Sequence, residues 1–458
     1  ENVAVGYVAM GNATTGKYNV AVGARAMENG ITTGDNNVSI GRYAGYAMTS
    51  GTQNISIGTQ AGDALLGGSD NIAIGQEALS AEDGHGKNIA IGSLTLQSQN
   101  AGADAYNIAI GYQAGLNVTT GVDNVILGGS AGDALTSGSS NIAIGRLALS
   151  TEDTGGRNVA IGHKALEDLD YAGSAYNVAI GYEAGKEVST GTANTIIGGN
   201  SGVALTTGAD NVSLGYNSLS TEDTGNRNTA LGRGTLQNLN YNGNGYNTAV
   251  GYEAGNDITT GIQNTIIGSL AGDALTTGMN NIAIGYSALS TDDASSCNVA
   301  IGAHALEDLN VDSTAYNTAV GHAAGRNVTT GTSNTILGGL AGDALTAGSS
   351  NVAIGTQALS LEDDHSFNVA VGARALEVLN AGAHGYNVAV GYTAGLSMST
   401  GTQNTIIGGL AADALTTGTN NMVIGYNAAA SAVDANNEIT LGDANISAFR
   451  CADDSIST

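Results

Sequence analysis

The chain has 458 residues, with 70 Gly, no Pro and no Trp, and its formal net charge is −27 at pH 7. Its 13 basic and 40 acidic residues exclude the Lys- and Arg-rich surface that nucleic acid or an anionic membrane requires. No apolar run reaches the length of about 18 residues that a membrane-spanning helix needs, so we expect no membrane insertion.

One pentad, Asn-x-Ala-Ile-Gly or a close variant, recurs along almost the whole chain. Copies begin at Asn107 and Asn124, for example, and 25 copies begin with Asn between Asn2 and Asn421. A last copy has Glu438 in the first place, and neighbouring copies mostly start 17 residues apart. A short fixed period predicts a stack of similar coils, which grows by repetition and needs no separate domain cores.

The coil at residues 107–123 shows the pattern of one repeat. Hydrophobicity alternates from Ile108 to Ile110, as it does in a short strand. We expect Ile108 and Ile110 to point into the coil and Ala109 to point outward. Repeated along the stack, the outward alanines would form a long exposed apolar stripe, which other copies of the chain would cover in a closed cyclic oligomer.

The rest of this coil is predicted to contain a second strand. Gly111 is expected to end the first strand at a turn, and residues 112–116 follow with a small residue, Ala114, at their third place. Because Ala also occupies this place in other coils, we expect a tightly packed second strand there. A second turn is predicted at 119–121, where Gly permits positive φ.

The pentad asparagines are expected to be structural. Asn side chains that stack on one another form ladders in which each amide bonds the next. The first residues of eight consecutive pentads are predicted to form such a ladder: Asn107, Asn124, Asn141, Asn158, Asn177, Asn194, Asn211 and Asn228.

A longer period is superimposed on the coils. From Asn107 the pentad spacings run 17, 17, 17 and 19 and then repeat, so four coils form a 70-residue superrepeat. Its longer loop should bulge from one side, and insertions in solenoids often mark the binding face. The candidate binding residues are the tyrosines that flank these pentads: Tyr106, Tyr112, Tyr176, Tyr182, Tyr246, Tyr252, Tyr316, Tyr386 and Tyr392.

Two roles for these tyrosines stay open. Their rings could stack against sugars of a partner surface, or they could cover the strand edge or a subunit seam, which we favour. The position directly before the pentad Asn is otherwise variable, and we expect it to be exposed. In sister coils it holds Lys87, Arg157, Arg227, Cys297 and Phe367.

No catalytic or metal constellation stands out. The six His residues form no close pair with zinc-ligand spacing. A recurring Ala-Gly-Asp-Ala-Leu segment could hold Ca²⁺, although a turn-stabilising Asp is favoured. Paired acids are expected to be a repeated surface feature rather than a glycosidase pair. We therefore expect no cofactor and no enzyme. The recurring Asp residues are Asp63, Asp133, Asp273 and Asp343, and the pairs are Glu152-Asp153, Glu222-Asp223 and Asp292-Asp293.

The pentads and the Gly-x-x-Ala that follows them resemble the head repeats of trimeric autotransporter adhesins. They are still more similar to the Ala-Ile-Gly-rich repeats of phage tail fibres. The segments 334–345 and 316–321 carry this resemblance, which covers residues 1–442. It implies an all-β fold, a left-handed parallel β-roll of about 26 coils, wound as a homotrimeric rod. The coils here are longer than those of the best-known adhesin heads.

The C-terminal segment carries a second resemblance. Residues 437–451 look like the segment just ahead of an endosialidase-type intramolecular chaperone, which trimerises a fibre and then cuts itself off. This resemblance implies a β-solenoid domain at 1–442 and a segment at 443–458 that leads to such a chaperone. It also implies that Thr458 lies at or near a mature, autoproteolytic end.

Three functions follow as hypotheses. The first is a phage tail-fibre protein, extracellular on the virion, that attaches to a host-surface glycan or protein. The second is the head of a bacterial adhesin, located on the cell surface. The third is a depolymerase that acts on surface polysaccharide, and we expect no such activity because no singular cleft is predicted.

Overall fold

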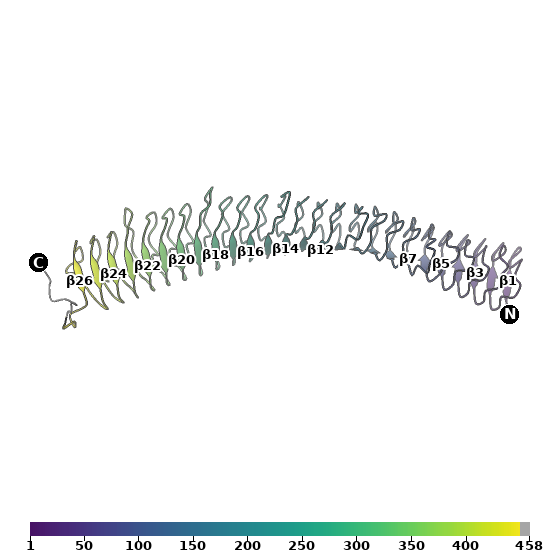
Figure 1. The fold of residues 1–458 in the computed structure, drawn as a ribbon, viewed down its shortest axis with the longest axis horizontal. Coiled ribbons are helices and arrows are strands. Elements are labelled where there is room, and N and C mark those ends of the chain that lie inside the picture. The colour runs from purple at the N-terminus through teal and green to yellow at the C-terminus, as the bar shows by residue number, and fades with distance from the viewer. Residues whose placement is uncertain (449–458) are drawn as a thin grey trace. The chain divides into compact units, whose positions relative to one another are not determined.

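The computed structural model describes residues 1–448, and the chain divides into two compact units, Glu1–Gly245 and Tyr246–Thr458. Each unit is a succession of coils with one three-residue strand per coil (Figure 1). The first unit holds β1 (Val3–Val5), β2 (Val20–Val22), β3 (Val38–Ile40), β4 (Ile55–Ile57), β5 (Ile72–Ile74), β6 (Ile89–Ile91), β7 (Ile108–Ile110), β8 (Val125–Leu127), β9 (Ile142–Ile144), β10 (Val159–Ile161), β11 (Val178–Ile180), β12 (Thr195–Ile197), β13 (Val212–Leu214) and β14 (Thr229–Leu231).

The second unit repeats the same plan. Its strands are β15 (Thr248–Val250), β16 (Thr265–Ile267), β17 (Ile282–Ile284), β18 (Val299–Ile301), β19 (Thr318–Val320), β20 (Thr335–Leu337), β21 (Val352–Ile354), β22 (Val369–Val371), β23 (Val388–Val390), β24 (Thr405–Ile407), β25 (Met422–Ile424) and β26 (Ile439–Leu441).

Within each unit, every strand pairs in parallel with the strand of the next coil. Pairing joins equivalent places of the pentad, so that Ile142 lies beside Val159 and Ala143 beside Ala160. Identical registers run from β1 to β14 and from β15 to β26. The predicted class, an all-β parallel solenoid with about 26 turns some 17 residues apart, is confirmed. Residues 1–448 contain no helix, and hence none long and apolar enough to cross a membrane.

The predicted second strand is wrong. Residues 112–117 form consecutive turns rather than an extended segment. Gln113 and Gly115 have left-handed φ values of 57° and 60°, which interrupt any strand geometry. The segment still bonds to the neighbouring coil, since the Gly115 N–H donates to the Ala131 carbonyl at 2.9 Å. Ala114 is fully buried, so the small residue at this place does mark tight packing.

The predicted direction of the strand side chains is also wrong. Ala109 is completely buried inside its coil, whereas Ile108 and Ile110 are 36% and 38% exposed. In β2 to β25 the central residue of the strand is likewise buried, and the first and third residues are partly or fully exposed. Each coil is a single narrow turn of chain, so its interior accepts a small side chain at most strand centres, and the β-branched residues are left on the outer face of the sheet. The alanine stripe therefore needs no partner to cover it.

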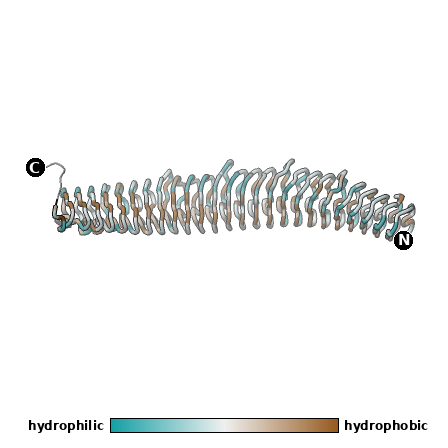
Figure 2. The backbone as a smooth tube through the Cα atoms, turned by 60° about the horizontal axis from the view of Figure 1, so that its bottom comes forward, coloured by the Kyte–Doolittle hydropathy of each residue, from teal (hydrophilic) through white to brown (hydrophobic). Residues whose placement is uncertain are grey.

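Larger side chains also enter the interior, and some of them lie beside glycines. Ile126, at the centre of β8, is fully buried. A Cβ on Gly115 would lie 2.9 Å from the Ile126 Cδ1, and a Cβ on Gly132 would lie 2.9 Å from the Leu135 Cδ1. These glycines give Ile126 and Leu135 the volume that they fill, as close-packed interiors require. Apolar segments recur from coil to coil along each unit (Figure 2).

The glycine that ends each pentad permits the close approach of successive coils. From Gly6 to Gly425 these glycines have φ values between 128° and 143°, a region that L side chains rarely adopt. A Cβ on Gly128 would lie 2.7 Å from both the carbonyl carbon and the oxygen of Gly145 in the next coil. Any side chain here would both strain the backbone and push two coils apart.

Gly128→Ala should destabilise the first unit, whereas Gly129→Ala should not. The backbone strain alone costs about 1–3 kcal/mol, and the contact with Gly145 adds to it. Gly129 is the matched control, because its backbone is not left-handed and its nearest neighbour, the Tyr112 carbonyl oxygen, is 4.0 Å away. Denaturant unfolding followed by circular dichroism measures both variants, and equal effects would contradict the stated role of the pentad glycine.

Candidate functional site

The asparagine ladder holds each strand at its start. The Asn107 Oδ1 accepts the backbone N–H of Asn124 at 2.9 Å, and the Asn107 Nδ2 donates to the Gly121 carbonyl at 2.8 Å. Asn124 repeats both bonds, to Asn141 and to Gly138. Most hydrogen bonds of the ladder therefore join an Asn side chain to the backbone. The predicted bonds between neighbouring side-chain amides are longer, for example 3.2 Å between the Asn194 Nδ2 and the Asn177 Oδ1. The eight asparagines of the predicted ladder are all fully buried, as fits a structural role.

Asn124→Ala should destabilise the fold strongly. It leaves the buried N–H of Asn141 and the buried carbonyl of Gly138 without these partners, at a cost of about 1–3 kcal/mol for each group. Asn100→Ala is the control, because Asn100 is exposed and its backbone N–H bond to Thr119 is kept. Thermal unfolding compares the two variants, and a difference within about 0.5 kcal/mol would overturn the ladder's role.

The nine predicted tyrosines all lie on the surface, but the structure does not gather them into one site. Tyr106 precedes Asn107 at the start of β7, and Tyr112 follows Gly111 at its end, so the two flank opposite ends of the strand. Their side chains are 52% and 58% exposed. Six exposed tyrosines were missed, of which Tyr171 lies in a longer loop. The places of the other five beside a pentad could have revealed them: Tyr7, Tyr18, Tyr216, Tyr286 and Tyr426.

The tyrosines that precede the pentad pack against the variable position of the coil before. The Lys87 Nζ lies 5.1 Å from the centre of the Tyr106 ring and donates to its hydroxyl at 3.1 Å. The Arg157 guanidinium lies 5.7 Å from the Tyr176 ring centre. Phe367 replaces the cation once and stacks on Tyr386. This position is exposed, as predicted, except at Cys297, which is half-buried. The side chains of Lys87, Arg157 and Phe367 support the tyrosines.

Buried carboxylates form a second recurring feature, and here the prediction of a surface pair is wrong for the first acid of each pair, whereas the second, such as Asp153, is exposed or half-buried. Glu152 is fully buried, and its two oxygens accept the N–H groups of Gly155 at 2.6 Å and Tyr171 at 3.3 Å. Tyr171 belongs to the longer loop of the next coil, so the buried carboxylate fastens that loop. Fully buried acids also lie at multiples of 70 residues from Glu152: Glu82, Glu222, Asp292 and Glu362.

Burial raises the pKa of all of these acids. For Glu152, desolvation is the largest cause, and the bonds from Gly155 and Tyr171 oppose it. Desolvation raises the pKa of Asp292 to about 6, against hydrogen bonds from Ser295. The pKa of the half-buried Asp273 in the Ala-Gly-Asp-Ala-Leu segment is likewise raised to about 6, again chiefly by burial. Because burial disfavours the ionised form of these carboxyls, it also disfavours the ionised oxygens that Ca²⁺ binds.

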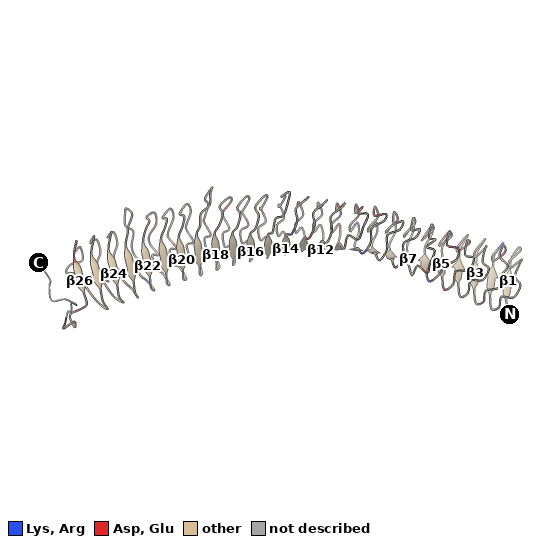
Figure 3. Ribbon diagram, viewed as in Figure 1, with Lys and Arg blue, Asp and Glu red and all other residues tan. Residues whose placement is uncertain are grey.

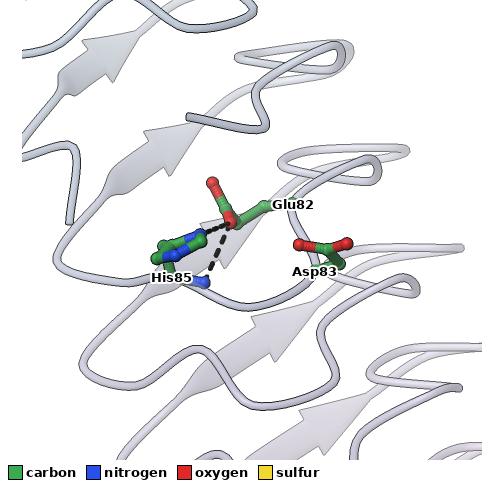
Figure 4. Close-up of side chains that lie close together, drawn as sticks. All are labelled: Glu82, Asp83 and His85. Carbon is green, nitrogen blue, oxygen red and sulfur yellow. Dashed lines mark hydrogen bonds and ion pairs between the residues drawn. The ribbon is translucent and has the colours of Figure 1, made fainter. Parts of the chain in front are cut away.

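Within residues 1–448, three clusters hold groups of the kind that ligate metal ions. Glu82, Asp83 and His85 place one donor atom each within 4.8 Å of one another (Figure 4). Glu362, Asp363 and His365 repeat this Glu-Asp-x-His segment, whereas the third cluster has only carboxylates: Glu152, Asp153 and Asp170. The nitrogen-containing clusters suit a transition metal and the all-oxygen cluster suits Ca²⁺. The sequence analysis missed both His-containing clusters, although the repeated segment was visible.

These clusters are partly explained without an ion. The Glu82 Oε1 already accepts the His85 backbone N–H at 3.0 Å and lies 3.7 Å from the His85 Nδ1. The His365 Nδ1 lies 2.8 Å from the Glu362 Oε1. The histidines therefore serve as partners of the buried carboxylates. None of the recurring Ala-Gly-Asp-Ala-Leu acids joins a three-ligand cluster within residues 1–448.

Comparison with known proteins gives no family. No family model matches the chain, and no curated protein matches it. Structural geometry and the resemblance of the repeats therefore carry the functional argument.

The buried acids predict that the fold becomes less stable as pH rises from about 4 to about 6. A carboxyl whose pKa is raised in the folded state stabilises the fold while it is protonated, and this contribution is lost as pH rises through the folded value, about 6 for Asp292. The free energy of unfolding should therefore fall across this window. Asp292→Asn should remove part of this pH dependence, and a stability that instead rises with pH there would contradict the assignment.

Proposed function

We propose that this chain is a structural segment of a phage tail fibre, extracellular on the virion, that assembles as a homotrimer and attaches to a host surface. The observation that carries this proposal is the outer face of the sheets. It is formed by the first and third residues of every strand, and none of these residues is charged, although the chain has 40 acidic and 13 basic residues (Figure 3).

This outer face is apolar as well as uncharged. Val, Ile, Leu and Thr occupy almost all of its positions, and Leu214 and Leu337 are each 45% exposed. An apolar patch that continues from coil to coil within each unit exceeds what a soluble monomer ordinarily exposes. Copies that pack with these faces together bury apolar surface and keep the acidic turns apart. Closed cyclic symmetry is the common way to do this, and the resemblance to trimeric fibres and left-handed β-rolls favours three copies.

Host attachment is supported by the exposed tyrosines and by repetition. Aromatic side chains with a hydroxyl group recur along both ends of the strands and can contact sugars or protein. Many weak contacts on three chains add by multivalency, which suits a fibre. We propose no catalytic role, because the notable acids recur in every superrepeat and fasten loops instead of forming one singular cleft.

Polar substitutions on the outer face should disrupt assembly without unfolding the chain. The triple variant Ile142→Asn, Val159→Asn and Val178→Asn changes the first places of three adjacent strands. We expect a weakened trimer, measured by sedimentation equilibrium, with circular dichroism unchanged. Ala143→Asn is the inward control and should destabilise the fold itself, because Ala143 is fully buried.

Two results would contradict this function. A native chain that sediments as a monomer with its outer face in water would overturn the fibre assembly. Release of reducing sugar from a surface polysaccharide by the purified protein would favour a depolymerase. A bacterial adhesin head shares the same physics, and a membrane-anchor domain encoded downstream in the same reading frame would select it.

A further inference from the structure

The position directly before the pentad Asn holds a basic residue in three coils that lie 70 residues apart: Lys87, Arg157 and Arg227. The residues that surround the basic side chain differ between these coils. Lys87 is paired with Asp104, with 2.6 Å between Nζ and the carboxylate oxygen. Arg227 is paired with Asp210, with 3.5 Å between Nε and the carboxylate oxygen. In both coils a carboxylate from an adjacent coil neutralises the cation. Arg157 occupies the same position in the coils between them, 70 residues after Lys87 and 70 before Arg227.

The coils around Arg157 have lost both carboxylates. Ser140 stands where the next superrepeat has Asp210, and Ser174 stands where the preceding one has Asp104. Among residues 1–448 no carboxylate lies within salt-bridge distance of Arg157, in a chain where acids outnumber basic residues threefold. Its guanidinium donates instead to the Ser174 hydroxyl and, at 3.4 Å, to the Tyr176 hydroxyl. The cation is thus held in place but not neutralised.

Arg157 belongs to the lining of a surface pocket of about 230 Å³. Ser137, Ser140, Thr154 and Ser174 also line this pocket, and Arg157 is the only charged residue among the lining residues. The backbone of the lining is fixed, because the Arg157 N–H donates to the Ser139 carbonyl at 3.1 Å and residues 156 and 174 form a parallel bridge.

We propose that this pocket binds an acidic sugar residue, with the sugar carboxylate taking the place that Asp104 and Asp210 take in the sister coils. A planar guanidinium binds a carboxylate through paired N–H donors. The serine and threonine hydroxyls can bond sugar hydroxyls, and the Tyr176 ring, 57% exposed, lies beside the guanidinium for stacking. This inference rests on the proposed attachment function, since it names a ligand class for it.

The net charge of −27 does not prevent such binding. Exposed charges farther away than about 8–10 Å are largely screened at physiological ionic strength, and Arg157 is the only charged residue that lines the pocket. Neutral sugars lack the group that Arg157 recognises, whereas a free inorganic anion lacks the hydroxyls. The pocket should therefore prefer a molecule that carries both.

The test is titration of the full chain with sodium D-glucuronate, followed by NMR or calorimetry. We expect one site per chain with a dissociation constant on the order of 1 mM, and binding at least about tenfold weaker for D-glucose and for inorganic sulfate. Arg157→Gln should abolish glucuronate binding. Ser140→Asp should also abolish it, because the introduced carboxylate reproduces the pairing seen between Asp210 and Arg227.

Ser140→Asp is compatible with the fold, because Asp70 and Asp210 occupy this place in sister coils. Arg146→Gln, an exposed cation outside the pocket, is the matched control and should bind glucuronate as the native chain does. Absence of glucuronate binding to the native chain, or unchanged binding by the two pocket variants, would overturn the proposal. Sulfate that binds as tightly as glucuronate would overturn the assignment to a sugar. A monomeric chain that binds glucuronate would overturn the fibre and leave the pocket intact.

Discussion

The structure depends on backbone hydrogen bonds between successive coils, which require the coils to approach closely at both ends of each short strand. At the start of the strand, the Asn107 side chain bonds the next Asn and a turn glycine. At its end, a glycine such as Gly128 leaves the space into which a Cβ could not fit. With both ends fixed by the pentad, the rest of the coil can vary in sequence, which explains how loops, tyrosines and buried acids change from coil to coil while the register of pairing does not.

Much of this fold could be predicted from the sequence, and the errors have physical causes. The strand positions and the coil period follow from the pentad spacing alone. A period of two shows that Ile108 and Ile110 share a face, but it does not show which face is inside. Side-chain volume and the glycines nearby decide that question, and in β7 the buried residue is Ala109. The small residues after Gly111 indicate close packing and therefore favour a second strand. In the structure Gln113 adopts a left-handed φ, which no propensity scale would assign to it.

For the candidate sites, the period of the sequence was both a help and an obstacle. The period identified which asparagines form the ladder and which tyrosines are exposed. It could not show that Tyr106 and Tyr112 flank opposite ends of the strand. Repetition also suggested that Glu152 lies on the surface, whereas the structure buries it against the amides of Gly155 and Tyr171. The Arg157 pocket is recognised only by comparing coils that lie 70 residues apart. The sister coils keep a carboxylate beside the basic residue, and the coils around Arg157 do not.

The most direct test of this account is a cryo-electron microscopy map of the assembled protein at a resolution that distinguishes alanine from isoleucine. The account predicts three chains around one axis, with the strand-centre alanines inside each coil and the β-branched residues of β1 to β26 between the chains. A map with the isoleucines inside the coils, or with single chains whose apolar face meets only solvent, would contradict it.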